Sequence, residues 1–172
     1  MDITLELLSL KNAQGVYDFE VENRAYFEKH VPPRGDDYYI IENYNRFIGE
    51  LLDEQSRGEC YMYVVYDECK NVVGRVNFPY IWHAEVRSAE LGYRIGQGTV
   101  GKGVATKAIQ AALMLGSQVH EIKEVTAGTS ADNIASQRVL EKNGFTLVGK
   151  KGNFVELNGQ RLDFLQYIKY LQ

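Results

Sequence analysis

The order of predicted elements indicates an α/β protein built on one mixed sheet. Strand-like and helix-like runs follow one another as β-α-α-β-β-β-α-β-α-β-β over the 172 residues. The first of these strands is followed by two helices, and the next three are joined by short turns, which is typical of an antiparallel meander rather than of a parallel sheet. No Pro/Ser-rich linker and no internal repeat interrupts the chain. We therefore expect a single domain over residues 1–172.

Each element of the first half follows from a local pattern. The run "ITLELLSL" alternates as a strand does, and Asn12 can cap the helix that follows it. The segment "HVPPRGDD" then breaks the chain. The second helix is predicted by apolar residues at i, i+4, i+7, i+8, i+11 and i+12, namely Ile40, Tyr44, Phe47, Ile48, Leu51 and Leu52. It is the clearest amphipathic helix in the sequence.

The second half is read in the same way. The runs "CYMYVVY" and "VVGRVNFPYI" flank the polar turn "DECKN", and "AEVRSAELGYRI" gives a third strand. A helix is predicted from about Lys102 to Gly116, and the strand "IKEVTAG" follows it. Asp132 is a good N-cap for a helix that stops at Asn143-Gly144. Two final strands meet at Asn158-Gly159, the signal of a type I′ hairpin.

Composition excludes several classes of protein. A formal net charge of -4 argues against a surface for nucleic acid, which needs clustered lysine and arginine. No apolar run is long enough to span a membrane, and the N-terminus "MDITLELLSL" lacks the basic start of a signal peptide. Cys60 and Cys69 have neither disulfide-framework nor metal-ligand spacing, so we expect a cytoplasmic protein without a metal site.

The stretch "GQGTVGKGVAT" matches more than one phosphate-binding motif. Gly96, Gly98 and Gly101 spell the dinucleotide fingerprint, but three antiparallel strands precede it and too little chain follows for a doubly wound sheet. Gly96, Gly101 and Lys102 fit a nucleotide phosphate loop, except that Gly103 replaces the hydroxyl residue that reaches the metal. The residues in and around this stretch therefore argue against both interpretations.

A helix N-terminus that attracts an anion is common to all interpretations of this stretch. The first amides of a helix lack intrahelical partners, and the helix dipole favours negative charge there. Gly101 and Gly103 would let the backbone close on a diphosphate without interference from a Cβ atom. A glycine-rich turn without any ligand remains the alternative.

The segment "AELGYRIGQGTVGKGVATKAI", followed by "ADNIASQRVLEKNGF", resembles the acetyl-coenzyme-A motifs of the GNAT superfamily of acyltransferases. "NRAYFEKHVPP" and "SAELGYRIG" further resemble the branch that acetylates protein N-termini, including those of ribosomal proteins (alanine or serine). The resemblance covers nearly the whole chain. It implies a single-domain GNAT-like fold, with a mixed central sheet of about six to seven strands flanked by about four helices. It also implies acetyl-CoA as co-substrate and no metal.

The resemblance assigns the cofactor contacts residue by residue. The strand would lie along pantetheine, separating from its neighbour at a bulge, and Asn133 would hydrogen-bond the pantetheine arm or the acetyl region. The implied cofactor residues are Leu91, Gly92, Tyr93, Arg94, Ile95, Gly98, Thr99, Gly101, Lys102, Gly103, Val104, Ala105 and Asn133. The chain departs from the pattern at Val100, where the family usually has Gln or Arg.

Catalytic roles follow less directly. Glu90 resembles the glutamate that serves as base in the histone-acetylating branch, with a structural ion pair to an arginine as the alternative. The tyrosine that many members use to protonate the thiolate is replaced by Leu140, so Ser136, one turn after Asn133, is the available hydroxyl. An ordinary helix serine is equally compatible with Ser136. His30 and His83 are reserve bases.

The acceptor is expected to be an amine in a ternary complex with acetyl-CoA. Tyr38, Trp82 and Glu85 are the candidate acceptor-binding residues, on the loops that flank the groove in this family. A protein or peptide N-terminus is the leading acceptor. A small amine such as an antibiotic or polyamine, and a non-catalytic CoA-binding module, are the alternatives. The sequence leaves the oligomeric state, including a homodimer, open.

Overall fold

An eight-stranded mixed sheet organises the molecule, whose computed structural model describes residues 1–172. The strands are β1 (Thr4–Leu7), β2 (Tyr61–Tyr66), β3 (Val72–Phe78), β4 (Ile81–His83), β5 (Arg87–Ile95), β6 (Glu124–Ser130), β7 (Thr146–Leu157) and β8 (Gln160–Tyr170). The helices are α1 (Ala13–Glu22), α2 (Arg24–Phe27), α3 (Ile41–Ser56), α4 (Val104–Gln118) and α5 (Ile134–Lys142), with 3-10 turns η1 (Asp36–Tyr39) and η2 (Gln97–Thr99). The predicted α/β class is confirmed.

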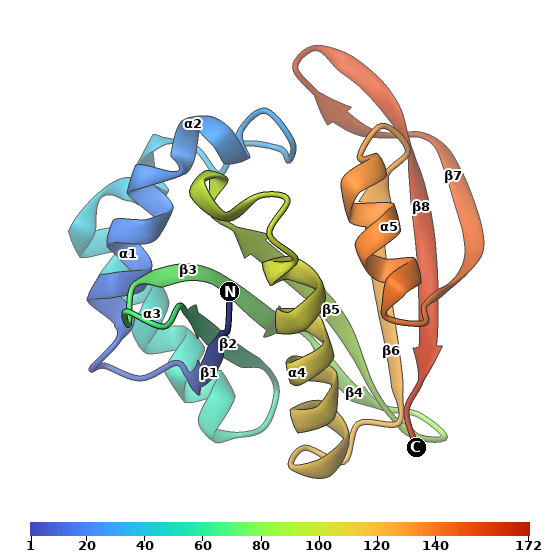
Figure 1. Cartoon of the computed structure of the whole chain (residues 1–172), viewed down its shortest axis with the longest axis horizontal. Coiled ribbons are helices and arrows are strands. Elements are labelled where there is room, and N and C mark those ends of the chain that lie inside the picture. The colour runs from blue at the N-terminus through green and yellow to red at the C-terminus, as the bar shows by residue number, and fades with distance from the viewer.

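The sheet order is β1-β2-β3-β5-β6-β8-β7, with β4 paired to β5 beside this path. All neighbours are antiparallel except β5 and β6, which run parallel. Helix α4 makes the crossover between these two strands, as a parallel connection requires. The one parallel pair therefore lies in the centre of the sheet and directs both of its carboxyl ends to the same edge (Figure 1).

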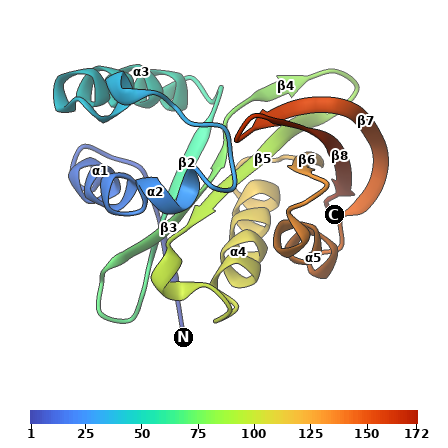
Figure 2. The ribbon, with the colours of Figure 1, turned by 90° about the horizontal axis from the view of Figure 1, so that it is seen from above.

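Helices cover both faces of the sheet and form two apolar clusters. Helices α4 and α5 pack on one face through the larger cluster, which includes Ala108, Ile109 and Leu140. Helices α1 and α3 pack on the other face, where Val16 and Ile48 meet strand β2. Figure 2 shows these layers from above. None of the helices has both the length and the hydropathy needed to cross a membrane.

Three details differ from the sequence-based expectation. Ile81–His83 forms a separate short strand, β4, because Pro79 and Tyr80 interrupt the predicted run. Helix α4 begins at Val104 and not at Lys102, because Gly103 has a left-handed φ of 76° that a helix cannot contain. The N-cap of α5 is Asn133 and not Asp132, since the Asn133 side chain accepts from the backbone of the third helical residue.

The last two strands form a long hairpin, as predicted. Asn158 and Gly159 both have positive φ, 52° and 75°, which is the geometry of a type I′ turn. The hairpin arches over the sheet toward the loop that follows α2 (Figure 2). It thus forms one side of the region in which the candidate site lies.

Candidate active site

Helix α4 begins at an open N-terminus. Gly101 and its N-cap residue Gly103 have φ of 77° and 76°, and no side chain caps the first turn. Five amides at this start have no backbone acceptor: those of Gly101, Gly103, Val104, Ala105 and Thr106. A Cβ atom built on either glycine would meet nothing within 4 Å, so the space above these amides is open. Free amides, open space and the positive helix end fit a diphosphate.

Lys102 closes this loop instead of contributing a free amide. Its N–H donates to the carbonyl of Thr99 at 3.3 Å, and its Nζ donates to the carbonyl of Gly98 at 2.8 Å. This differs from the sequence-based expectation, which placed the Lys102 amide in the diphosphate cradle. Thr106 supplies the additional free amide one turn further on. The side chain of Thr99 is also engaged within the loop, since its Oγ1 donates to the carbonyl of Gly96.

The central sheet splits between β5 and β6. Parallel pairing runs only from Ser88, opposite Glu124, to Leu91, opposite Ala127. Beyond that point β5 continues as Gly92–Ile95 and remains paired with β3 alone, while β6 remains paired with β8. No register shift accompanies the separation, so the bulge that the resemblance implied is absent from the β5–β6 pair. One edge of Gly92–Ile95 is left free for the amides of an extended ligand.

The start of α5 faces this split with the side-chain amide of Asn133 and the hydroxyl of Ser136. The Oδ1 atom of Asn133 accepts from the Ser136 amide at 3.0 Å, which leaves the Asn133 Nδ2 free to donate. Ser136 Oγ lies 2.7 Å from the hydroxyl of Tyr93, which reaches across from β5. Burial raises the pKa of Tyr93, and the hydrogen bond with Ser136 offsets this only in part. Both hydroxyls are therefore protonated at neutral pH.

Glu90 lies on the other side of β5. Glu90, Gly92 and Arg94 share one face by strand alternation, and Leu91 on the opposite face packs in the core beneath α4. The Glu90 side chain is exposed and forms no salt bridge. The alternative role, a structural ion pair with an arginine, is therefore not observed. It is thus free to accept a proton from a group that approaches from the α1 and α3 side.

A buried ion network, which the sequence analysis did not identify, anchors the free half of β5. Glu20 of α1 is fully buried and binds Arg75 Nε at 2.5 Å and Arg94 Nη1 at 2.7 Å. Burial raises the pKa of Glu20, but the two arginines outweigh it and leave the pKa below its usual range. In the sequence, the burial of Glu20 is indicated by its helical spacing, which places it on the same face of α1 as Val16 and Phe19.

The proposed acceptor residues are dispersed. Trp82 pairs with Ser88 two positions from Glu90 and is 37% exposed. Glu85 lies in the β4–β5 turn, at the end of β5 away from the glycine loop. The Tyr38 ring packs against Tyr44 of α3, with the Arg34 guanidinium over it. The structure brings only Trp82 near Glu90.

The two reserve histidines also separate. His83 lies in β4 and shares a hydrogen bond with Arg87 at 3.0 Å. His30 lies after α2 and helps to line a cavity of about 170 Å³ that reaches Asn133, Ser130 and the hairpin turn. This cavity joins the start of α5 to the acceptor side of the sheet, so His30 is the histidine that lies closer to the candidate site.

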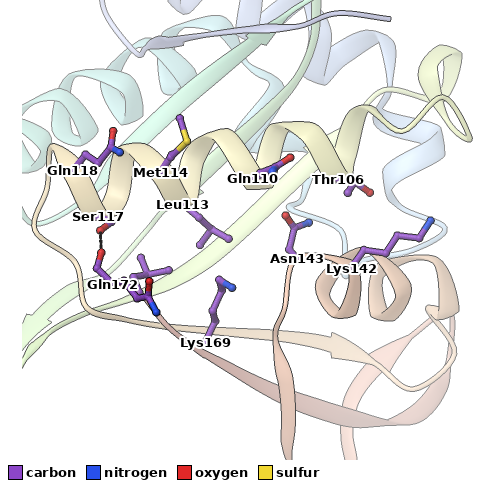
Figure 3. A pocket seen from close by; sticks show the side chains of 11 residues that line it. Thr106, Gln110, Leu113, Met114, Ser117, Gln118, Lys142, Asn143, Lys169 and Gln172 are labelled. Carbon is purple, nitrogen blue, oxygen red and sulfur yellow. Dashed lines mark hydrogen bonds between the residues drawn. The ribbon is translucent and has the colours of Figure 1, made fainter.

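A larger cavity of about 430 Å³ lies between α4, the end of α5 and the C-terminal strand, and reaches the first turn of α4 at Thr106. Figure 3 shows its lining, which includes Thr106, Lys142 and Lys169, and the hydrogen bond between Ser117 and Gln172. None of the predicted site residues lines it. The candidate site is therefore defined by the split between β5 and β6 and by the two helix starts, and not by the larger cavity.

Comparisons with known proteins agree with this geometry. The family model of the acetyltransferase (GNAT) domain matches residues 2–146. The chain is 30% identical over 155 residues to a Bacillus subtilis protein named probable N-acetyltransferase YjcK, covering 88% of this chain and 84% of the relative. It is 24% identical over 162 residues to the ribosomal protein uS5-alanine N-acetyltransferase of Escherichia coli, covering 94% and 84%.

Solved structures give the same result. The microcin C7 self-immunity acetyltransferase MccE, determined with acetyl-CoA and AMP, superposes with a TM-score of 0.85 at 27% identity, covering 99% of this chain and 93% of that one. The family match spans most of the chain, and the open helix start, the split sheet and the likeness to an acetyl-CoA complex agree on the same co-substrate. The chain belongs to the GNAT family of acetyltransferases and uses acetyl-CoA as its acetyl donor.

Proposed function

We propose that this enzyme acetylates the N-terminal α-amine of a protein or peptide. The observation that carries the proposal is the pairing of two features at one place: a donor site formed by the split sheet, and an exposed, unpaired Glu90 on the open side of that split. Likeness to the Escherichia coli enzyme that acetylates ribosomal protein uS5 supports a protein N-terminus as acceptor.

The free amides at the start of α4 hold the diphosphate, and the free edge of Gly92–Ile95 with Asn133 Nδ2 orients the pantetheine arm. Acetyl-CoA supplies the activated thioester. The amides of Glu90 and Gly96 donate to Tyr80 and Val73, so the alternate amides of Tyr93 and Ile95 point to the free edge of β5. The Tyr93 amide is therefore the donor available for the thioester carbonyl, a contribution typically worth about 3 to 4 kcal/mol. Holding both reactants together contributes further, by roughly 7 to 11 kcal/mol in favourable cases.

Two protons move during the transfer. Glu90 accepts the proton that the amine loses, directly or through water, and Ser136 Oγ donates one to the departing sulfur. The Tyr93 hydroxyl, 2.7 Å from Ser136 Oγ, can return a proton to that oxygen. General acid and base groups of this kind typically contribute about 10²- to 10⁴-fold each.

A small polyamine is the second candidate acceptor. A spermidine N-acetyltransferase of Vibrio cholerae, solved with CoA and spermine, has a similar fold. A thiol-release assay with three amines separates the candidates: a peptide with a free N-terminus, the same peptide with a blocked N-terminus and a free lysine, and spermidine. We expect turnover of the first substrate alone. Turnover of spermidine without turnover of the peptide contradicts the proposal.

Glu90→Gln tests the assigned base. We expect kcat to fall by about 10²-fold or more. We also expect the pH dependence of kcat to change. Acetyl-CoA should still stabilise the variant by about 2.7 kcal/mol at 100 times its Kd, a melting shift of roughly 5 to 11 °C. Unchanged kinetics would remove Glu90 from this role.

A further inference from the structure

An aromatic ring lies directly on a glycine at the mouth of the split. Gly128 of β6 is the first residue beyond the last β5–β6 pair, Leu91 with Ala127. A Cβ atom built on Gly128 would lie less than 3.0 Å from three atoms of the Phe164 ring, which side chains essentially never tolerate. The ring therefore occupies its position because residue 128 has no side chain.

Strand registers place this ring on the acceptor side of the sheet. Glu90 is opposite Thr126 in the parallel pair, so Glu90, Thr126 and Gly128 share a face. Ala127, which alternates with them, belongs to the core beneath α4. Phe164 is opposite Ser130 in β8, and its ring leans diagonally over Gly128. Because the core closes the other face, an amine can approach the split only from the side that carries Glu90 and Phe164.

A second ring extends this wall. Phe154 of β7 lies with its centroid 5.6 Å from that of Phe164, and Lys151 Nζ lies 4.9 Å from the Phe154 centroid. Phe154 is 61% exposed, whereas Phe164 is half-buried. The inner ring thus contacts Gly128, and Phe154 adds a second, more exposed ring beside it.

We propose that Phe164, seated on Gly128, limits the size of the side chain on the carbon that bears the acceptor amine. This inference rests on the proposed α-amine acceptor. A ring fixed in this position leaves the least room for branched and long side chains, so we expect Gly, Ala and Ser at the first position to be accepted more readily than Val and Leu. Sites that sense a single methylene discriminate by roughly 10- to 200-fold.

The test uses the full-length enzyme and five peptides that differ only in the first residue: Gly, Ala, Ser, Val or Leu. We expect the native enzyme to prefer Ala over Leu, whose side chain has three more carbon atoms, by about 30-fold in kcat/KM, within the range that a single methylene can produce. Phe164→Ala should reduce this ratio about 10-fold, with Phe164→Leu in between. Phe154→Ala should retain the ratio, because the inner ring stays on Gly128. The thermal shift with acetyl-CoA should be the same in all variants.

The outcomes are distinguishable. If the native enzyme acetylates the peptides and Phe164→Ala and Phe164→Leu both keep its Ala/Leu ratio, this inference is overturned and the proposed function stands. If the native enzyme shows a thermal shift with acetyl-CoA but acetylates none of the five peptides, the proposed acceptor is wrong and the inference falls with it. Should Phe164→Ala fail to fold, Phe164→Leu decides the matter, since it keeps an apolar side chain in the hairpin.

Discussion

Helices α4 and α5 both begin at the edge where the parallel strands β5 and β6 end, yet their N-termini are built differently. The start of α4 has no side-chain cap and leaves its amides free above open space. The start of α5 is closed by its own Asn133, whose Oδ1 accepts from the Ser136 amide. The first provides positive potential and the second provides side chains in fixed positions. In the proposed mechanism, one helix start thus binds an anion and the other positions a donor hydroxyl.

The largest expected effect comes from placing a negative charge at the open start. Gly103→Asp should weaken acetyl-CoA binding by roughly 300-fold, because like charges placed together in an interface cost several kcal/mol. Isothermal titration with CoA measures the loss.

Gly159→Asp is the matched control for this change. Gly159 has φ of 75° and, like Gly103, nothing within 4 Å of a built Cβ, but it lies in the β7–β8 turn. Both variants carry the same backbone strain and the same added charge, so only Gly103→Asp should lose the coenzyme. Equal loss in both variants would mean that strain, and not charge at the helix start, is responsible.

The second effect concerns the hydroxyl that the closed start presents. Ser136→Ala leaves the cap intact, because Asn133 binds the backbone amide of residue 136 and not its side chain. We expect kcat to fall about 100-fold, the lower range for a general acid, with no change in CoA affinity and a loss of unfolding free energy of about 1 kcal/mol from the broken hydrogen bond to Tyr93. Stopped-flow measurement of thiol release gives the rate. Tyr93→Phe removes only the partner hydroxyl, and its smaller decrease would identify Ser136 as the group that donates to sulfur.

The difference between the two helix starts was only partly predictable from the sequence. Gly101 and Gly103 indicate an open start, since glycine readily adopts positive φ, and this was predicted. Asp132 and Asn133 are both good caps, and local patterns do not distinguish adjacent residues of similar propensity. The choice depends on how the chain leaves β6, which is a tertiary property. The same limit applied to Lys102, whose amide is engaged by a turn within the loop.

Contacts between distant segments were the least predictable part of the site. Tyr93 and Ser136 are 43 residues apart, and their hydroxyls meet only because β5 and α5 lie on either side of the split. Glu20 reaches Arg75 and Arg94 across a helix and two strands. Periodicity gives the face on which each residue lies, but not which residue of another element it meets. The strand alternation of Glu90 and Leu91, by contrast, is local and was predicted correctly.

The smallest expected effect separates the two roles of Asn133. Asn133→Ala removes the cap and the free Nδ2 donor, so we expect a loss of unfolding free energy of about 1 kcal/mol and roughly fivefold weaker CoA binding, equivalent to about 1 kcal/mol for one hydrogen bond. Asn133→Asp keeps an oxygen that accepts from the Ser136 amide but has no amide group to donate. It should therefore retain native stability in urea unfolding while binding CoA at least as weakly as Asn133→Ala. If Asn133→Asp binds CoA as the native enzyme does, Asn133 acts only as a cap, and α5 contributes Ser136 alone to the coenzyme side of the split.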